Sequence, residues 1–214
     1  MPPPDNGVGN PTCDASPWCR DHRGRPYSFE AFLELTRTFH GYSAPGVIIG
    51  AKMVDIAMNR LPSGVLFDAV SETAKCLPDA VQLLTPCTCG NGWLRVAPLG
   101  RYALTLFDKH SGRGVRVYVH AAQLEPYPET RYWFYGLKPK RKDKTDLLIR
   151  EIRQARERLY GVQYVRVKPE ILSKEPSDPR AICPECGEAY PAGHGRICRG
   201  CRPETSYIAE EENP

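Results

Sequence analysis

Two Cys-x-x-Cys pairs near the C-terminus limit what this chain can fold into more than any other feature. Cys183 and Cys186 form the first pair, Cys198 and Cys201 form the second, and eleven residues separate the two pairs. A two-residue gap lets both thiolates of a pair reach one ion, and zinc prefers four such ligands in a tetrahedron. The roughly forty residues around the pairs carry few apolar side chains, so burial alone could not fold them. We therefore predict a small zinc ribbon with these four cysteines as ligands.

The alternative for this motif is a pair of redox-active sites. Thioredoxin-like redox motifs lie next to a βαβ pattern, and none surrounds these cysteines, so the spacing favours zinc. His194 lies between the pairs and could compete as a ligand, but four cysteines already complete the shell. Zinc ribbons bind nucleic acid, bind proteins or cap a fold, and we favour a structural or protein-contact role here.

Cysteine usage and charge narrow the class of protein further. Nine cysteines are too many to be incidental and, being odd in number, cannot all pair, so a reducing compartment with metal or thiol chemistry is favoured. No apolar run is long enough to span a membrane, and residues 1–11 lack the apolar core of a signal peptide. We expect a cytoplasmic protein with no membrane partner. A net charge of +4 is too small to predict a nucleic-acid partner.

Hydrophobic periodicity divides the remainder of the 214 residues. Residues 1–26 are rich in Pro, Gly, Asn and Asp without a period, which indicates an N-terminal arm. We assign residues 27–172 to one α+β domain and residues 173–214 to a polar linker, the ribbon and an acidic tail. Ser28 is the expected N-cap of the first helix, and Gly161 the expected end of the last. The predicted helices span residues 29–39, 47–61, 78–84 and 146–160, and the predicted strands 65–70, 93–96, 102–107, 115–119 and 164–167.

The middle of the chain carries an unusual set of residues. His40-Gly41 precedes Pro45-Gly46 at the start of a helix, Cys76 follows, and Cys87-Thr88 opens a glycine-rich loop. From about Phe29 to Val119 this set resembles the FmdE-like family, which takes its name from a component of formylmethanofuran dehydrogenase. The resemblance rests on Phe39-His40-Gly41, Pro45-Gly46, Gly50, Ala57, Cys76, Asp79-Ala80-Val81-Gln82, Thr85, Cys87-Thr88, Gly90-Asn91-Gly92, Gly100 and Ser111-Gly112-Arg113-Gly114-Val115-Arg116-Val117.

The resemblance implies an α+β core with a mixed sheet, often dimeric, a metal site at a helix N-terminus and a C-terminal zinc ribbon. The family's first motif usually reads His-Gly-His-x-Cys-Pro-Gly, whereas this chain has Tyr42 and Ala44 where the second His and the Cys are expected. Tyrosine is a poor zinc ligand and alanine offers none. His40, Cys76 and Cys87 remain as the predicted cofactor-binding residues. Three soft ligands could hold a metal with an open position; alternatively, the site has lost its metal and the thiols are free.

Three functions follow from these observations. The first is a metal-binding accessory protein, with zinc as cofactor, that acts as a homodimer and is linked to molybdenum or tungsten enzyme systems. The second is a thiol-dependent enzyme or sulfur-transfer protein that uses Cys76 or Cys87, since a thiol at a helix N-terminus is activated. The third is a nucleic-acid-binding regulator that uses the ribbon. The sequence leaves open whether the chain is an enzyme.

Overall fold

The computed structural model describes residues 16–137, 145–173 and 178–202. The chain divides into two compact units, Met1–Leu172 and Ser173–Pro214, and each is described by itself. None of the helices in the described ranges is long and apolar enough to cross a membrane.

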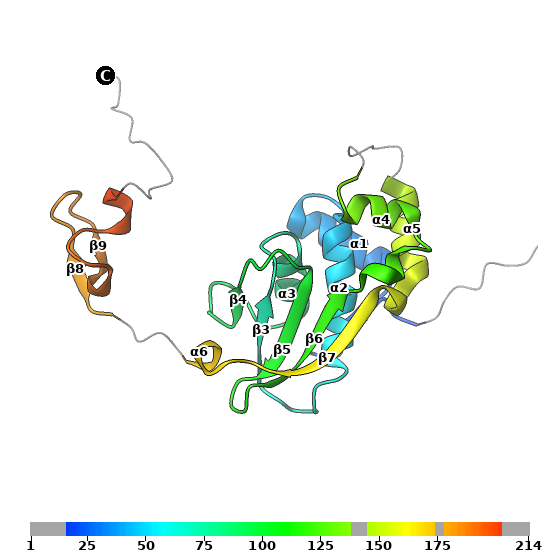
Figure 1. Ribbon diagram of the computed structural model, residues 1–214, viewed down its shortest axis with the longest axis horizontal. Coiled ribbons are helices and arrows are strands. Elements are labelled where there is room, and N and C mark those ends of the chain that lie inside the picture. The colour runs from blue at the N-terminus through cyan, green and yellow to red at the C-terminus, as the bar shows by residue number, and fades with distance from the viewer. Residues whose placement is uncertain (1–15, 138–144, 174–177, 203–214) are drawn as a thin grey trace, which may run out of the picture. The chain divides into compact units, whose positions relative to one another are not determined.

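The first unit contains a five-stranded mixed sheet with helices packed against it (Figure 1). Its strand order is β4-β3-β5-β6-β7; β3 and β4 run parallel and the other neighbours antiparallel. The predicted α+β class with a mixed sheet is therefore confirmed. In chain order the elements are β1 (Cys19–Arg20), β2 (Pro26–Tyr27), α1 (Phe29–His40), α2 (Pro45–Met58), β3 (Phe67–Ser71), α3 (Leu77–Leu84), β4 (Leu94–Val96), β5 (Ala103–Asp108), β6 (Arg113–Val119), α4 (Pro128–Phe134), α5 (Thr145–Ala155), β7 (Tyr160–Arg166) and α6 (Pro169–Leu172).

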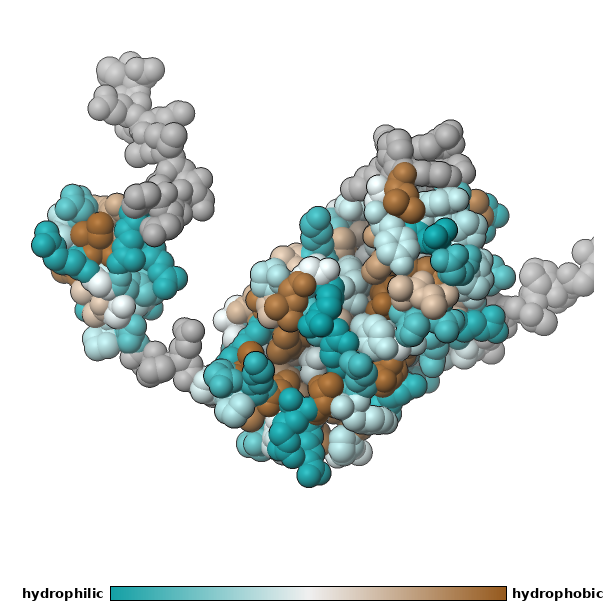
Figure 2. Space-filling view, viewed as in Figure 1, coloured by the Kyte–Doolittle hydropathy of each residue, from teal (hydrophilic) through white to brown (hydrophobic). Residues whose placement is uncertain are grey.

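Helix α2 forms the centre of the core. Every residue from Gly46 to Ala57 is buried, and the helix packs against β5 and β6. Apolar residues on most faces predicted this burial. The helix begins at Pro45 rather than at residue 47, because proline is preorganised for the first helical position. In the space-filling view, hydrophilic side chains are interspersed with apolar ones over the visible face of this unit (Figure 2).

Two glycines allow α3 to lie directly against α2. A Cβ atom on Gly50 would come within 2.7 Å of the Cβ atom of Ala80, and one on Gly46 within 2.7 Å of the Cβ atom of Cys76. Since the glycines are four residues apart, they share one face of α2 and leave a groove for α3. The N-terminal ends of the two helices are therefore in contact.

The end of the last long helix differs from the prediction. Helix α5 ends at Ala155, a short 3₁₀ turn spans Arg156–Leu159, and Gly161 lies within β7 instead of capping a helix. Arg156 adopts a positive φ of 48°, which breaks the helix one turn early. Gly161 suits a strand here because the ring of Tyr118 lies where its Cβ atom would be. The aromatic run that forms α4 was likewise not predicted to be helical.

A buried ion pair fastens the start of the described chain to α2. Lys52 Nζ lies 3.2 Å from Asp55 Oδ2, and the backbone N–H of Arg20 donates to Asp55 Oδ1 at 2.9 Å. The ammonium group also lies 5.0 Å from the ring centroid of buried Trp18. Both charged groups are almost fully buried, so the attraction between them is needed to offset the cost of removing each charge from water.

We expect Asp55→Ala to lower the free energy of unfolding by about 3–5 kcal/mol, because it leaves the buried Lys52 ammonium without its counter-charge. Urea denaturation followed by circular dichroism would measure the loss. The matched control is Asp55→Ala combined with Lys52→Met, which removes both charges and should recover much of the stability. A single variant as stable as the wild type would contradict this account.

Candidate functional site

The second unit brings the four predicted cysteine ligands together. It consists of β8 (Arg180–Ile182), β9 (Ala189–Pro191) and two 3₁₀ turns, Ala192–His194 and Arg199–Cys201. The four sulfur atoms all lie within 4.8 Å of one another. Cys183 Sγ lies 3.9 Å from Cys201 Sγ, and Cys186 Sγ lies 3.8 Å from Cys198 Sγ. A zinc tetrahedron with Zn–S bonds of about 2.3 Å has edges of about 3.8 Å, so the sulfur atoms already stand at ligand spacing.

Local backbone geometry prepares these thiols for a cation. The backbone N–H of Cys198 donates to Cys183 Sγ at 3.4 Å, and this bond is the main cause that lowers the pKa of the Cys183 thiol to about 6. Gly187 takes a left-handed φ of 78° directly after the first pair, which a residue with a side chain would rarely adopt.

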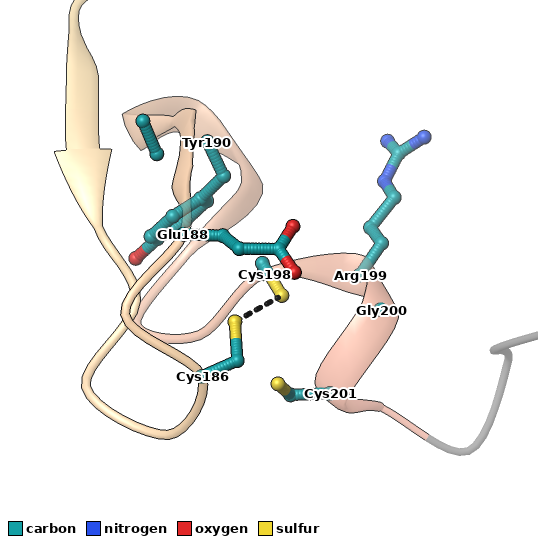
Figure 3. Close-up of a pocket in the computed structure, with 8 residues that line it drawn as sticks. Cys186, Glu188, Tyr190, Cys198, Arg199, Gly200 and Cys201 are labelled. Atoms are coloured by element: carbon teal, nitrogen blue, oxygen red, sulfur yellow. Dashed lines mark hydrogen bonds between the residues drawn. The ribbon is translucent and has the colours of Figure 1, made fainter. Parts of the chain in front are cut away.

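Hydrogen bonds between the thiols oppose the deprotonation of Cys201. Contacts with Cys186 and Cys198 raise the pKa of the Cys201 thiol above its ordinary value. Several thiolates cannot share such a small space without a positive charge between them. A dication removes that penalty, and four soft sulfur donors in a tetrahedral arrangement fit zinc. Figure 3 shows the sulfur atoms of Cys186, Cys198 and Cys201 gathered around the same space. His194 is not a member of this group.

The described residues 178–202 of the second unit bury few apolar side chains. Its buried cluster comprises Cys183, Tyr190 and Cys198, so two of the three members are themselves ligands. Tyr190 donates its hydroxyl to the carbonyl of Gly195 at 2.7 Å, which secures the loop between the two pairs. A metal bound by the four cysteines would therefore take the place of a hydrophobic core among the described residues of this unit.

The first unit brings two of its three predicted site residues to the N-terminal ends of α2 and α3. His40 ends α1, and its Nδ1 atom lies 2.5 Å from Asp79 Oδ2 on α3. Because a carboxylate can only accept, Nδ1 carries the proton and Nε2 is left with a lone pair when the ring is neutral. In the sequence, Asp79 is part of a family motif, and nothing there predicts a role for it in the site. Its position three residues after Cys76 was the available signal.

Cys76 completes this end of the core together with a tyrosine. It lies just before α3 with a φ of 55°, a conformation that non-glycine residues rarely adopt, and its side chain contacts Gly46. Tyr102 donates its hydroxyl to the carbonyl of Gly46 at 2.7 Å. Burial holds the pKa of Tyr102 well above its ordinary value, and the nearby Cys76 and Asp79 add to the effect. Tyr102 is thus a neutral hydrogen-bond donor.

Cys87 has different surroundings. Its thiol is fully buried and points to the carbonyl of Phe67 at 3.5 Å. Burial raises the pKa of Cys87 to about 11, so the thiol is protonated at neutral pH. Because the thiolate is the nucleophile and the metal ligand, this setting weakens the hypothesis of a reactive Cys87.

Within the described ranges, the only group of three or more converging His, Cys, Asp or Glu side chains is the four-cysteine cluster. His40, Cys76 and Cys87 do not form such a group. Their joint role as a cofactor site stays a prediction.

Comparison with known proteins identifies the family. The model described as FmdE, molybdenum formylmethanofuran dehydrogenase operon, matches residues 39–166, which is more than half of the chain. The chain belongs to the FmdE family. A second model, the FmdE treble clef zinc finger, matches residues 177–208 and includes all four cysteine ligands. The resemblance stated from the sequence is confirmed, and the family places the four-cysteine unit among its zinc fingers.

A solved structure and a curated relative agree with this assignment. The crystal structure of a tungsten formylmethanofuran dehydrogenase FmdE-like protein from Syntrophus aciditrophicus matches with a TM-score of 0.80 and 45% identity, over 89% of this chain and 99% of that one. A probable S-adenosyl-L-methionine-binding protein from Archaeoglobus fulgidus is 31% identical over 178 residues. That match covers 73% of this chain and 48% of the relative, so the chain spans about half the length of the curated relative.

Removing the metal should unfold the second unit and leave the first intact, since the buried cluster of the second unit consists mainly of ligands. We expect a strong chelator to make the ribbon sensitive to protease, while a fragment close to Met1–Leu172 survives. Limited proteolysis with mass spectrometry, with and without added zinc, measures this. Cys183→Ser should reproduce the effect of the chelator, and Cys89→Ser, an exposed cysteine of the first unit, is the matched control. A ribbon that resists protease without metal would contradict the prediction.

Proposed function

We propose that this chain is a zinc-bearing accessory protein of a molybdenum or tungsten enzyme system. The observation that carries the proposal is a complete four-cysteine cluster joined to a domain of the FmdE family. The names of the family model and of the solved relative refer to molybdenum and tungsten formylmethanofuran dehydrogenases and supply the enzyme class. We also propose a cytoplasmic location, because a reducing compartment suits eight described cysteines that form no disulfide.

The chemistry of the ribbon favours a docking role over catalysis. Catalytic zinc keeps an open coordination position, whereas four cysteines fill the tetrahedron. Beside the first pair, Ile182 on β8 is 75% exposed, so this unit presents an apolar side chain to solvent. An exposed apolar side chain held by a metal-stabilised unit suits contact with a partner protein.

Affinity purification of the tagged full-length chain from its native cells tests the proposal. We expect molybdenum or tungsten, measured by mass spectrometry of the eluate, to be enriched several-fold over an untagged control. Ile182→Ser should reduce the enrichment, and Leu66→Ser, which removes another exposed apolar side chain from the first unit, should not. Equal amounts of both metals in the tagged and control eluates would refute the proposed partner.

We also propose that the chain forms a homodimer, supported by an exposed sheet edge. Among the described strands, β7 pairs with β6 alone, so its other side presents seven residues of backbone that could pair with a second strand. Tyr164 in the middle of this strand is 77% exposed. Antiparallel pairing of two β7 strands would place the two copies of this side chain in one interface and join the sheets.

Light scattering coupled to size-exclusion chromatography should give twice the 24.0 kDa mass of the chain. Tyr164→Arg should shift the mass towards the monomer, because it places like charges close together in the interface. Leu66→Arg introduces the same charge at another exposed apolar position and serves as the control. A wild-type protein that is monomeric at micromolar concentrations would exclude the dimer.

A further inference from the structure

The core domain differs from its family at the positions that matter for metal binding. Tyr42 and Ala44 occupy two positions that the family motif gives to ligands. We infer that the core of this chain works without a resident metal, and that His40, held by Asp79, instead accepts a hydrogen bond from a small ligand with an O–H or N–H donor. The inference does not depend on the accessory role proposed above.

Neither replacement can act as a ligand where it stands. Ala44 is completely buried at the start of α2, and its methyl side chain has no donor atom. Tyr42 is 54% exposed, and its ring lies 5.1 Å from the ring of His40. A neutral phenol is a weak ligand for zinc and similar metals. The ring instead covers one side of the imidazole.

The remaining donors do not replace the missing ones. A protein zinc site uses at least three protein ligands. In the described part of the first unit, His40, Cys76 and Asp79 do not converge to within 4.8 Å, and no set of three that includes Cys87 does so.

The His40–Asp79 pair by itself is compatible both with a metal site and with a site that binds no metal. Metal-bound histidines commonly donate their second N–H to a carboxylate, and so do histidines that act as bases. The number of available ligands decides between the two, and the described residues of the core provide no third ligand. What remains is a histidine whose tautomer is fixed by Asp79, so that Nε2 is the accepting atom.

The His40–Asp79 pair is partly exposed to solvent. The side chain of His40 is 19% exposed and that of Asp79 is 29% exposed, so solvent reaches the pair. Cys76 lies beside the adjacent start of α2, where the Tyr102 hydroxyl donates to the carbonyl of Gly46. Together these groups suit hydrogen bonding to a polar ligand of modest size.

Zinc stoichiometry of the purified full-length protein provides the first test. After saturation with zinc and desalting, we expect one equivalent per chain in the wild type and one in His40→Ala, since the ribbon holds it. The double variant Tyr42→His/Ala44→Cys restores the family ligands and should bind two equivalents, falling back to one when His40→Ala is added. Two equivalents in the wild type, reduced to one by His40→Ala, would overturn the inference. If the double variant still binds one equivalent of zinc, the absence of a core metal cannot be assigned to Tyr42 and Ala44.

Side-chain ¹⁵N NMR provides a readout that needs no substrate. At a pH where the His40 ring is neutral, it should show a protonated Nδ1 and an unprotonated Nε2, unchanged by zinc beyond the first equivalent. His40→Ala assigns the signals. Asp79→Ala should shift the tautomer towards protonated Nε2. A zinc-dependent shift of the His40 Nε2 resonance in the wild type would contradict a metal-free core. Loss of zinc from the ribbon alone would instead refute the zinc-bearing accessory role, so the two failures are distinguishable.

Discussion

The close contact between α2 and α3 is the constraint on which the rest of the core depends. It requires hydrogen atoms, and no side chains, at Gly46 and Gly50, because Cys76 and Ala80 fill the space that Cβ atoms would need. With α3 held against α2, Asp79 comes within reach of His40 at the end of α1. The same contact covers one flank of a helix that is buried along almost its whole length. The contact between α2 and α3 therefore both packs the core and places Asp79 beside His40.

The two units are stabilised by different means. The first buries a continuous apolar cluster between its helices and its sheet, with the Lys52–Asp55 pair as a charged exception that the surrounding groups compensate. The second has almost no apolar core and gathers four sulfur atoms at zinc spacing. Because of this difference, we expect metal removal to destabilise the four-cysteine unit and to leave the first unit folded.

Prediction from the sequence succeeded where the signal was local. Ser28 caps α1 by accepting the N–H of Ala31, as its position before an amphipathic stretch predicted. Prediction failed where a distant contact overrode the local pattern. Gly161 follows a helical period and suits a helix cap, yet it lies in β7, where the ring of Tyr118 occupies the space beside it. The segment Pro128–Phe134 has no clear helical period, yet it forms α4, which packs on α5.

The sequence by itself determined the four-cysteine cluster, the α+β class and the family, because ligand spacing, hydrophobic period and motif residues are properties of short segments. Only the tertiary structure showed that His40 is paired with Asp79, thirty-nine residues away, and that Cys87 is buried beside Phe67. The spacing of chemically similar residues along a chain does not reveal which of them share a site. Helix packing decides that, and here it brought His40 to a carboxylate rather than into a cluster of thiols.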